Sequence, residues 1–150
     1  MTNKDYVLET MRRYGRMAAL AVQEKSTEMN GTELNAEDSY IPAFHSACAK
    51  MNMLERKAGF VCISPYGRVV RLLQPYDSDV FTQAPEDLPA QFGFVWSTDP
   101  AKAKPFIALS TSPYNTGECC THEGHVWRSG QDGNVWAPGT PNVKWEEVTI

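Results

Sequence analysis

The sequence predicts a mainly β protein, built from small antiparallel β-modules in tandem with an N-terminal α-helix before them. Three observations lead to this prediction. Residues 4–28 are rich in good helix formers and contain no proline. From Gly59 onward, short runs of valine and aromatic residues alternate with turns rich in proline and glycine, which is typical of short strands joined by tight turns. The pattern of residues 59–96 then recurs in residues 114–148.

Size and charge narrow the classes of function. The chain has 150 residues, 42% of them hydrophobic and 21% charged, which fits one ordinary folded domain. A net charge of −4 argues against nucleic acid as a partner, because phosphate binding needs a basic face. No apolar run approaches the roughly 20 residues of a membrane span, and Met1–Tyr6 lacks the apolar stretch of a signal peptide. We therefore expect synthesis in the cytosol and no membrane partner.

The N-terminal segment, residues 1–30, is interpreted as an anchor or oligomerisation helix. Thr2 or Asn3 could cap its start, and Asn30-Gly31 is a good stop signal. Apolar residues spaced alternately by four and three form one stripe, which either packs on the rest of the chain or self-associates as a short bundle. The stripe consists of Val7, Met11, Tyr14, Ala18 and Ala21.

Residues 31–58 are predicted to connect this helix to the β-modules. Ile41-Pro42-Ala43-Phe44 is an extended stretch fixed by its proline, and His45 to Leu54 is predicted to add a helical turn or two.

Two strings of residues recur in register. Gly59–Cys62 followed by Gly67–Arg71 corresponds to Gly117–Cys120 followed by Gly124–Arg128. Asp79-Val80-Phe81 likewise corresponds to Asn134-Val135-Trp136. Each copy is interpreted as a hairpin, a loop that carries an aromatic residue, and a closing strand. The predicted organisation is a first β-module at 59–97, a linker at 98–113 and a second β-module at 114–150.

The second copy resembles the type-3 chitin-binding module, a small β-module attached to chitinases and cellulases. Its ending is also similar to C-terminal domains of structural proteins from tailed phages and prophages of Gram-positive bacteria. Cys120 stands where the module usually has valine, and Val135 replaces one of its paired exposed aromatics. The matching motifs are Tyr114-x-x-Gly117, Arg128-Ser129, Asn134-Val135-Trp136-Ala137-Pro138-Gly139 and Lys144-Trp145-Glu146-Glu147-Val148.

The resemblance implies sugar binding by flat, exposed aromatic rings, since the C–H face of a pyranose packs on such a ring. Trp136 is the first candidate, either as an exposed platform or as a lid on a small core, and Phe81 holds the matching place in the first copy. Tyr114 and Trp127 are candidate ligand-binding rings for which a core position is the alternative. Asn134, beside Trp136, is the polar candidate.

No catalytic constellation, metal site or cofactor site is expected. The candidate carboxylates lie on turns and an edge strand rather than in a dry cleft. His122 and His125 would need a third ligand such as Cys119 to hold zinc, and the cysteines are expected as free thiols.

The function expected from the resemblance is that of a non-enzymatic phage virion protein, from the tail, baseplate or head fibre, that attaches to host-surface glycan. It would be located in the virion, made in the host cytoplasm and extracellular when acting. Its partners would be a polymeric glycan, other virion proteins and further copies of itself, for example in a trimer. The alternatives are a secreted polysaccharide-binding accessory module of a glycoside hydrolase and a purely architectural virion protein.

Overall fold

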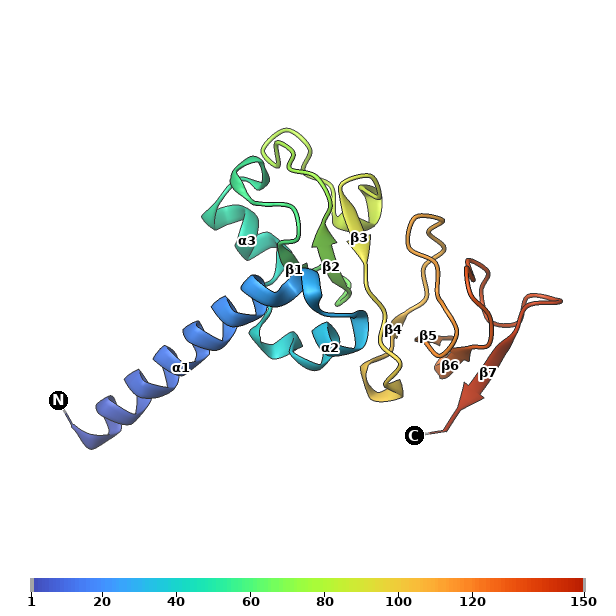
Figure 1. The fold of residues 1–150 in the computed structure, drawn as a ribbon, viewed down its shortest axis with the longest axis horizontal. Coiled ribbons are helices and arrows are strands. Elements are labelled where there is room, and N and C mark those ends of the chain that lie inside the picture. The colour runs from blue at the N-terminus through green and yellow to red at the C-terminus, as the bar shows by residue number, and fades with distance from the viewer. Residues whose placement is uncertain (1, 150) are drawn as a thin grey trace.

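The computed structural model describes residues 2–149, so Met1 and Ile150, the outer ends of the first and last predicted segments, lie outside it. A long helix projects from a body that contains two small sheets (Figure 1). About 34% of the chain is helical and 19% is strand, so the prediction of a mainly β protein overstates the strand content and the fold is mixed. The N-terminal helix and the small β-sheets are present as expected. The difference arises because the strands have only two to five residues and residues 31–58 are largely helical.

Helix α1 spans Asn3–Lys25. Thr2 caps it, since its hydroxyl accepts from the Asp5 backbone N–H at 3.1 Å and the Asp5 carboxylate accepts from the Thr2 N–H at 3.2 Å. Only Val22 of this helix is buried, where it packs against the body. The N-terminal half extends into solvent (Figure 1). No helix among residues 2–149 has both the length and the hydropathy needed to cross a membrane.

Asn30-Gly31 starts a helix instead of ending one. The Asn30 side chain accepts from the Glu33 N–H at 2.8 Å and so caps α2, Gly31–Ala36. A Cβ at Gly31 would collide with the backbone carbonyl oxygen of Trp96. Glycine is therefore required for close approach of two backbones, a tertiary reason that a local stop signal does not reveal.

The remaining helical elements are short. The helical turns expected at His45–Leu54 are present as α3, which begins one residue earlier, and η3. The full set after α1 and α2 is η1 Ser26–Glu28, η2 Asp38–Tyr40, α3 Phe44–Lys50, η3 Met53–Glu55, η4 Pro85–Asp87 and η5 Pro100–Lys102.

Two sheets form the rest of the body. The first is an antiparallel meander in the order β1-β2-β3. The second has the order β4-β5-β6-β7, in which β4 runs parallel to β5 and the other neighbours are antiparallel. The strands are β1 Val61–Ile63, β2 Val69–Leu72, β3 Phe92–Phe94, β4 Lys104–Pro105, β5 Cys119–His122, β6 His125–Ser129 and β7 Trp145–Val148.

The three-stranded meanders β1-β2-β3 and β5-β6-β7 have the same register. Gly59 and Gly117, which precede the first strands, both have positive φ (99° and 94°), as do Gly67 and Gly124 in the hairpin turns (85° and 82°). Corresponding residues pair in the two sheets: Val61–Arg71 and Cys119–Arg128, Cys62–Val70 and Cys120–Trp127, Leu72–Phe92 and Ser129–Trp145.

One aromatic stack joins the two sheets. The rings of Trp96 and Tyr114 lie parallel with centroids 4.4 Å apart, and Phe106 stacks on the other side of Tyr114 at 5.5 Å. The Trp96 indole N–H donates to the Ser112 carbonyl at 3.0 Å. Buried residues of both sheets belong to one hydrophobic cluster. The segment predicted as a linker, 98–113, supplies β4 and Phe106 to this shared structure.

A buried ion pair also connects the sheets. Arg68, which immediately precedes β2, donates to the Glu86 carboxylate at 2.9 Å and to the carbonyl of Pro105, in β4 of the second sheet, at 3.0 Å. The Ser64 hydroxyl donates to the same Glu86 oxygen at 2.7 Å. Both charged side chains are only 8% exposed, so each needs the other in this low-dielectric position.

Replacement of Arg68 by methionine is expected to destabilise the fold by about 3–5 kcal/mol, because Glu86 would remain buried without its cation. The exposed pair Arg13–Glu9 supplies the control, and Arg13→Met should change stability by less than about 0.5 kcal/mol. Urea unfolding of both variants measures the difference. Equal small effects would show that the buried pair does not hold the sheets together.

Candidate functional site

Trp136 lies in the loop between β6 and β7, with 48% of its surface exposed. The backbone beneath the ring is fixed at two points. The Trp136 N–H donates to the Asn134 side-chain oxygen at 3.2 Å, and the Trp136 carbonyl accepts from the Trp145 indole N–H at 2.8 Å. Trp145 itself is half-buried against Tyr114, at 5.5 Å between ring centroids. The result is an exposed aromatic ring on an anchored loop.

Asn134 supports this loop from below and does not face solvent. The residue is fully buried, and its amide donates to the Ser129 hydroxyl at 3.1 Å. Its backbone exchanges two hydrogen bonds with Tyr114, both at 2.8 Å. The expectation that Asn134 contacts a ligand is therefore corrected, because its polar atoms are already used inside the protein.

Tyr114 is a core residue and not a ligand-binding ring. It is fully buried between Trp96 and Phe106, and its hydroxyl accepts from the Ile107 N–H at 3.4 Å. Burial raises the pKa of Tyr114 far above its usual value. Because Tyr114 belongs to the aromatic stack between the sheets, the expectation that its ring could bind a ligand is corrected.

Trp127 is half-buried in β6 and packs against the edge of the core. Its indole N–H donates to the His122 carbonyl at 3.3 Å, and the His125 ring lies 6.4 Å away. Across the strands it stands opposite Cys120 and Glu147. Only part of this ring faces solvent, so it offers a smaller surface than Trp136.

Phe81 is the exposed ring of the first meander, with 51% of its surface accessible. Its N–H donates to the Asp77 carbonyl at 2.9 Å. The Asn52 amide braces the loop by donating to the carboxylates of Asp77 and Asp79 at 2.9 and 3.1 Å. The adjacent Val80 is also exposed, which widens the apolar surface. An asparagine thus anchors both loops that carry exposed rings.

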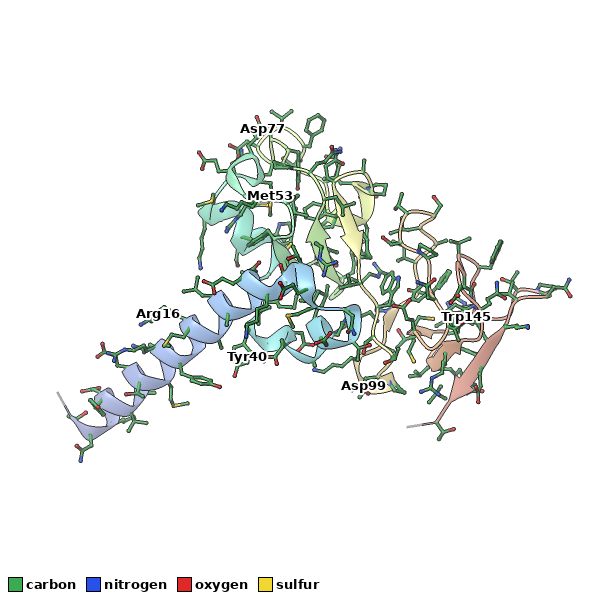
Figure 2. All side chains as sticks on the ribbon, in the orientation of Figure 1. Arg16, Tyr40, Met53, Asp77, Asp99 and Trp145 are labelled. Carbon is green, nitrogen blue, oxygen red and sulfur yellow. The ribbon has the colours of Figure 1, made fainter. Side chains whose placement is uncertain are left out.

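The structure does not bring the two loops together. Asp77, in the Phe81 loop, lies at the top of Figure 2, whereas Trp145, beneath the Trp136 loop, lies at the far right. Trp136 and Phe81 therefore belong to two separate candidate sites.

Tyr66 is an exposed ring that is not among the candidate ligand-binding residues predicted from the sequence. It is 63% exposed in the turn between β1 and β2, and the Arg68 guanidinium lies 5.8 Å from the ring centroid. The signal in the sequence is the turn Ser64-Pro65-Tyr66-Gly67, because the loops that connect strands run over the protein surface.

The ionisable groups of residues 2–149 include no cluster of three or more metal-binding side chains. His125 contacts Glu147 at 2.6 Å, and His122 lies 3.9 Å from Glu123. The four cysteines are free, and burial raises the pKa of Cys62 and of Cys120 to about 12. These two thiols stay protonated at neutral pH and are poor nucleophiles.

Glu118 lies at the base of the Trp136 loop. Burial raises its pKa, and repulsion by the Asp132 carboxylate adds to the rise, while the hydrogen bond from the Asn115 N–H at 2.6 Å partly offsets it. Thr116 in turn donates its N–H to Asp132 at 2.9 Å. A raised pKa in the folded state means that folding favours the protonated carboxyl.

Comparisons with family models, with curated proteins and with solved structures find no match for this chain.

Glu118→Gln is expected to stabilise the protein at neutral pH, because glutamine keeps the acceptor for Asn115 without the buried charge. The stability contributed by protonated Glu118 is fully present below its unfolded-state pKa and is lost as pH rises through its folded-state pKa. The gain should therefore vanish at low pH. Urea unfolding of wild type and variant from pH 3 to pH 8 measures it, and a gain independent of pH would contradict the assignment.

Proposed function

We propose that this chain is a non-enzymatic, glycan-binding structural protein of a phage virion, from the tail, baseplate or head fibre, that attaches to a polymeric glycan on the host surface. The observation that carries the proposal is the Trp136 ring, half exposed on a loop whose backbone is fixed by Asn134 and Trp145. The motif resemblance of residues 114–148 to type-3 chitin-binding modules and to phage structural domains supports the same choice.

An anchored aromatic ring suits sugar recognition for a thermodynamic reason. A pyranose has one face of C–H groups, which loses water when it packs on an aromatic ring. Because the loop is already ordered, little conformational entropy is lost on binding. Trp136 offers the largest such ring, and Phe81 with Val80 offers a second apolar surface.

Each candidate site is small, which favours a polymeric ligand over a free sugar. One ring contacts one or two sugar units, so single-site affinity should be weak. Two sites on separate loops, repeated over several copies of the chain, would raise the apparent affinity for a surface that displays many repeats. We therefore propose that the chain self-associates through α1, whose N-terminal half lies outside the body.

Trp136→Ala is expected to weaken glycan binding about tenfold or more, because it removes the stacking surface. Phe81→Ala should cause a smaller loss. Tyr66→Ala is the matched control, since Tyr66 is another exposed ring on the same body, 63% accessible. Pull-down on chitin, cellulose and Gram-positive cell walls, followed by a glycan array, measures the effects.

Circular dichroism of each variant confirms that the fold is intact. Equal losses in Trp136→Ala and Tyr66→Ala would indicate non-specific apolar adsorption and contradict the proposed site. Wild-type protein that binds none of these glycans would overturn the glycan proposal and leave an architectural role among virion proteins.

A further inference from the structure

A cleft lies where helix α1 enters the body, and it includes neither of the loops with exposed candidate rings. Its volume is about 670 Å³, which falls within the roughly 300–1,000 Å³ of small-molecule sites. Residues of α1 and of α3 line it, and residues 39–42 and Phe60 complete the lining. Two of the lining residues, Arg16 and Tyr40, are labelled in Figure 2. The chain therefore has a concave site that the proposed glycan surface does not use.

Much of the lining is apolar, and part of it belongs to the core. Ala47 and Ile41 are buried, and each packs in one of the two hydrophobic clusters of the body. Phe60 is half-buried beside them, and Ala19 and Leu20 add apolar surface from α1. Because core residues hold much of this surface, it is ordered before a ligand binds. An apolar group that covers it releases water from both surfaces.

Arg56 places a fixed cation in the cleft. Its Nη2 donates to the Ala47 carbonyl at 2.9 Å, and its guanidinium carbon lies 4.2 Å from the centroid of the Phe60 ring. Its Nε is buried without a hydrogen-bond partner. The ion pairs formed by residues 2–149 do not include Arg56. This guanidinium is held in place by uncharged groups, so its charge is available to a ligand.

Two further cations line the cleft, Arg16 from α1 and Lys50 from α3. Both are exposed, and neither forms an ion pair within the part of the chain that the structure describes. The lining contains no aspartate or glutamate. Asp38, in the nearby η2, is already paired with Lys102 at 3.1 Å and with Lys104 at 3.8 Å. A cleft lined by charges of one sign concentrates their field, so this cleft attracts anions.

The neighbouring groove does not share this charge. It has Arg56 and Phe60 in common with the cleft, but Glu24 and Glu55 line it together with Lys57. Two acids and two bases give that groove a balanced charge. The combination of an apolar surface with unopposed cations is therefore a property of the cleft between α1 and α3.

We propose that this cleft binds a small organic anion with an apolar body. The anionic group lies among Arg16, Lys50 and Arg56, which supply charge-assisted hydrogen bonds. The apolar body packs on Ala47 and Phe60. A neutral apolar molecule would make no use of the three cations, and a purely polar anion would leave the apolar surface in water. The ligand is distinct from the glycan proposed for the exposed rings.

Octanoate and 1-octanol test the two parts of this recognition, because they share one alkyl chain and differ in the charge of the head group. Amide NMR spectra of the full chain should show that octanoate binds with a dissociation constant of about 1 mM or tighter. The signals of Ala19 and Ala47 should be among those that shift. Octanol and inorganic phosphate should each bind about tenfold more weakly, because each satisfies only half of the site.

Three results would overturn the proposal. Octanoate at millimolar concentration that leaves the signals of the cleft unchanged would exclude the site. Octanol that binds as tightly as octanoate would remove the role of the cations. Phosphate that binds as tightly as octanoate would remove the role of the apolar surface.

Ala19→Phe tests the position of the ligand, and Ala21→Phe is its matched control. Ala19 is half-buried in the wall of the cleft, whereas Ala21 is exposed about 160° around the same helix. The added ring at position 19 fills the cleft, so octanoate affinity should fall about tenfold or more. Ala21→Phe should change it less than about threefold. Equal effects in two variants whose circular dichroism matches wild type would overturn the assigned position.

The double variant Arg16→Met with Lys50→Met tests the anion assignment and leaves the contacts of Arg56 in place. Octanoate affinity should fall about tenfold, and octanol affinity should change less than about threefold. Arg13→Met is the charge control, since Arg13 is on α1 but does not line the cleft. An equal loss of octanoate affinity in Arg13→Met, or an equal loss of octanoate and octanol affinity in the double variant, would contradict recognition of the anion by these cations.

Discussion

The contact between Trp96 and Tyr114 is the interaction on which the body depends. Two sheets of three or four very short strands cannot each enclose a core, because small units have too much surface for their volume. The stacked rings close the gap between the sheets, and Phe106 extends the stack from the intervening segment. Arg68 pairs with Glu86 and also donates to the Pro105 carbonyl of the second sheet, so this ion pair links the two sheets as well. The two meanders thus share one hydrophobic core.

The candidate site inherits its rigidity from this stack. Tyr114 is held by Trp96, Asn134 is held by two backbone hydrogen bonds to Tyr114, and the Asn134 side chain accepts from the N–H of Trp136. These contacts connect the backbone of the exposed Trp136 to the buried aromatic stack. An exposed tryptophan on a free loop would lose backbone entropy when it bound a sugar, whereas the backbone of Trp136 is already held by two hydrogen bonds. Two of the five candidate ligand-binding residues, Tyr114 and Asn134, are buried and support the Trp136 loop from inside the protein.

In contrast to the Trp136 loop, most of helix α1 makes no contact with the core. Its capping box and helix-forming composition favour a helix locally, but its N-terminal half lies outside the core.

The sequence by itself determined the local features of this protein. Helix formers and the Thr2 cap specified α1, and the repeated glycines with positive φ specified two hairpins in the same register. The turn-rich loops singled out Trp136 and Phe81 as candidate exposed rings but left open whether Trp136 covers the core, and in the structure both rings are about half exposed. Such features depend on the conformational preferences of a few neighbouring residues, which a single sequence contains.

Only the tertiary structure decided which aromatic residues form the core. Tyr114 and Trp136 are both large aromatic residues near turns in the sequence. In the structure Tyr114 is fully buried, whereas Trp136 is half exposed. The difference depends on Trp96 and Phe106, which reach Tyr114 from other segments of the chain. Gly31 is likewise typical of a helix end in the sequence, and only the structure shows that the Trp96 backbone lies beside it and leaves no room for a side chain. The helical share of residues 31–58 was underestimated for the same reason, because α2 and α3 are too short to persist without the contacts of Leu34 and Phe44 in the core.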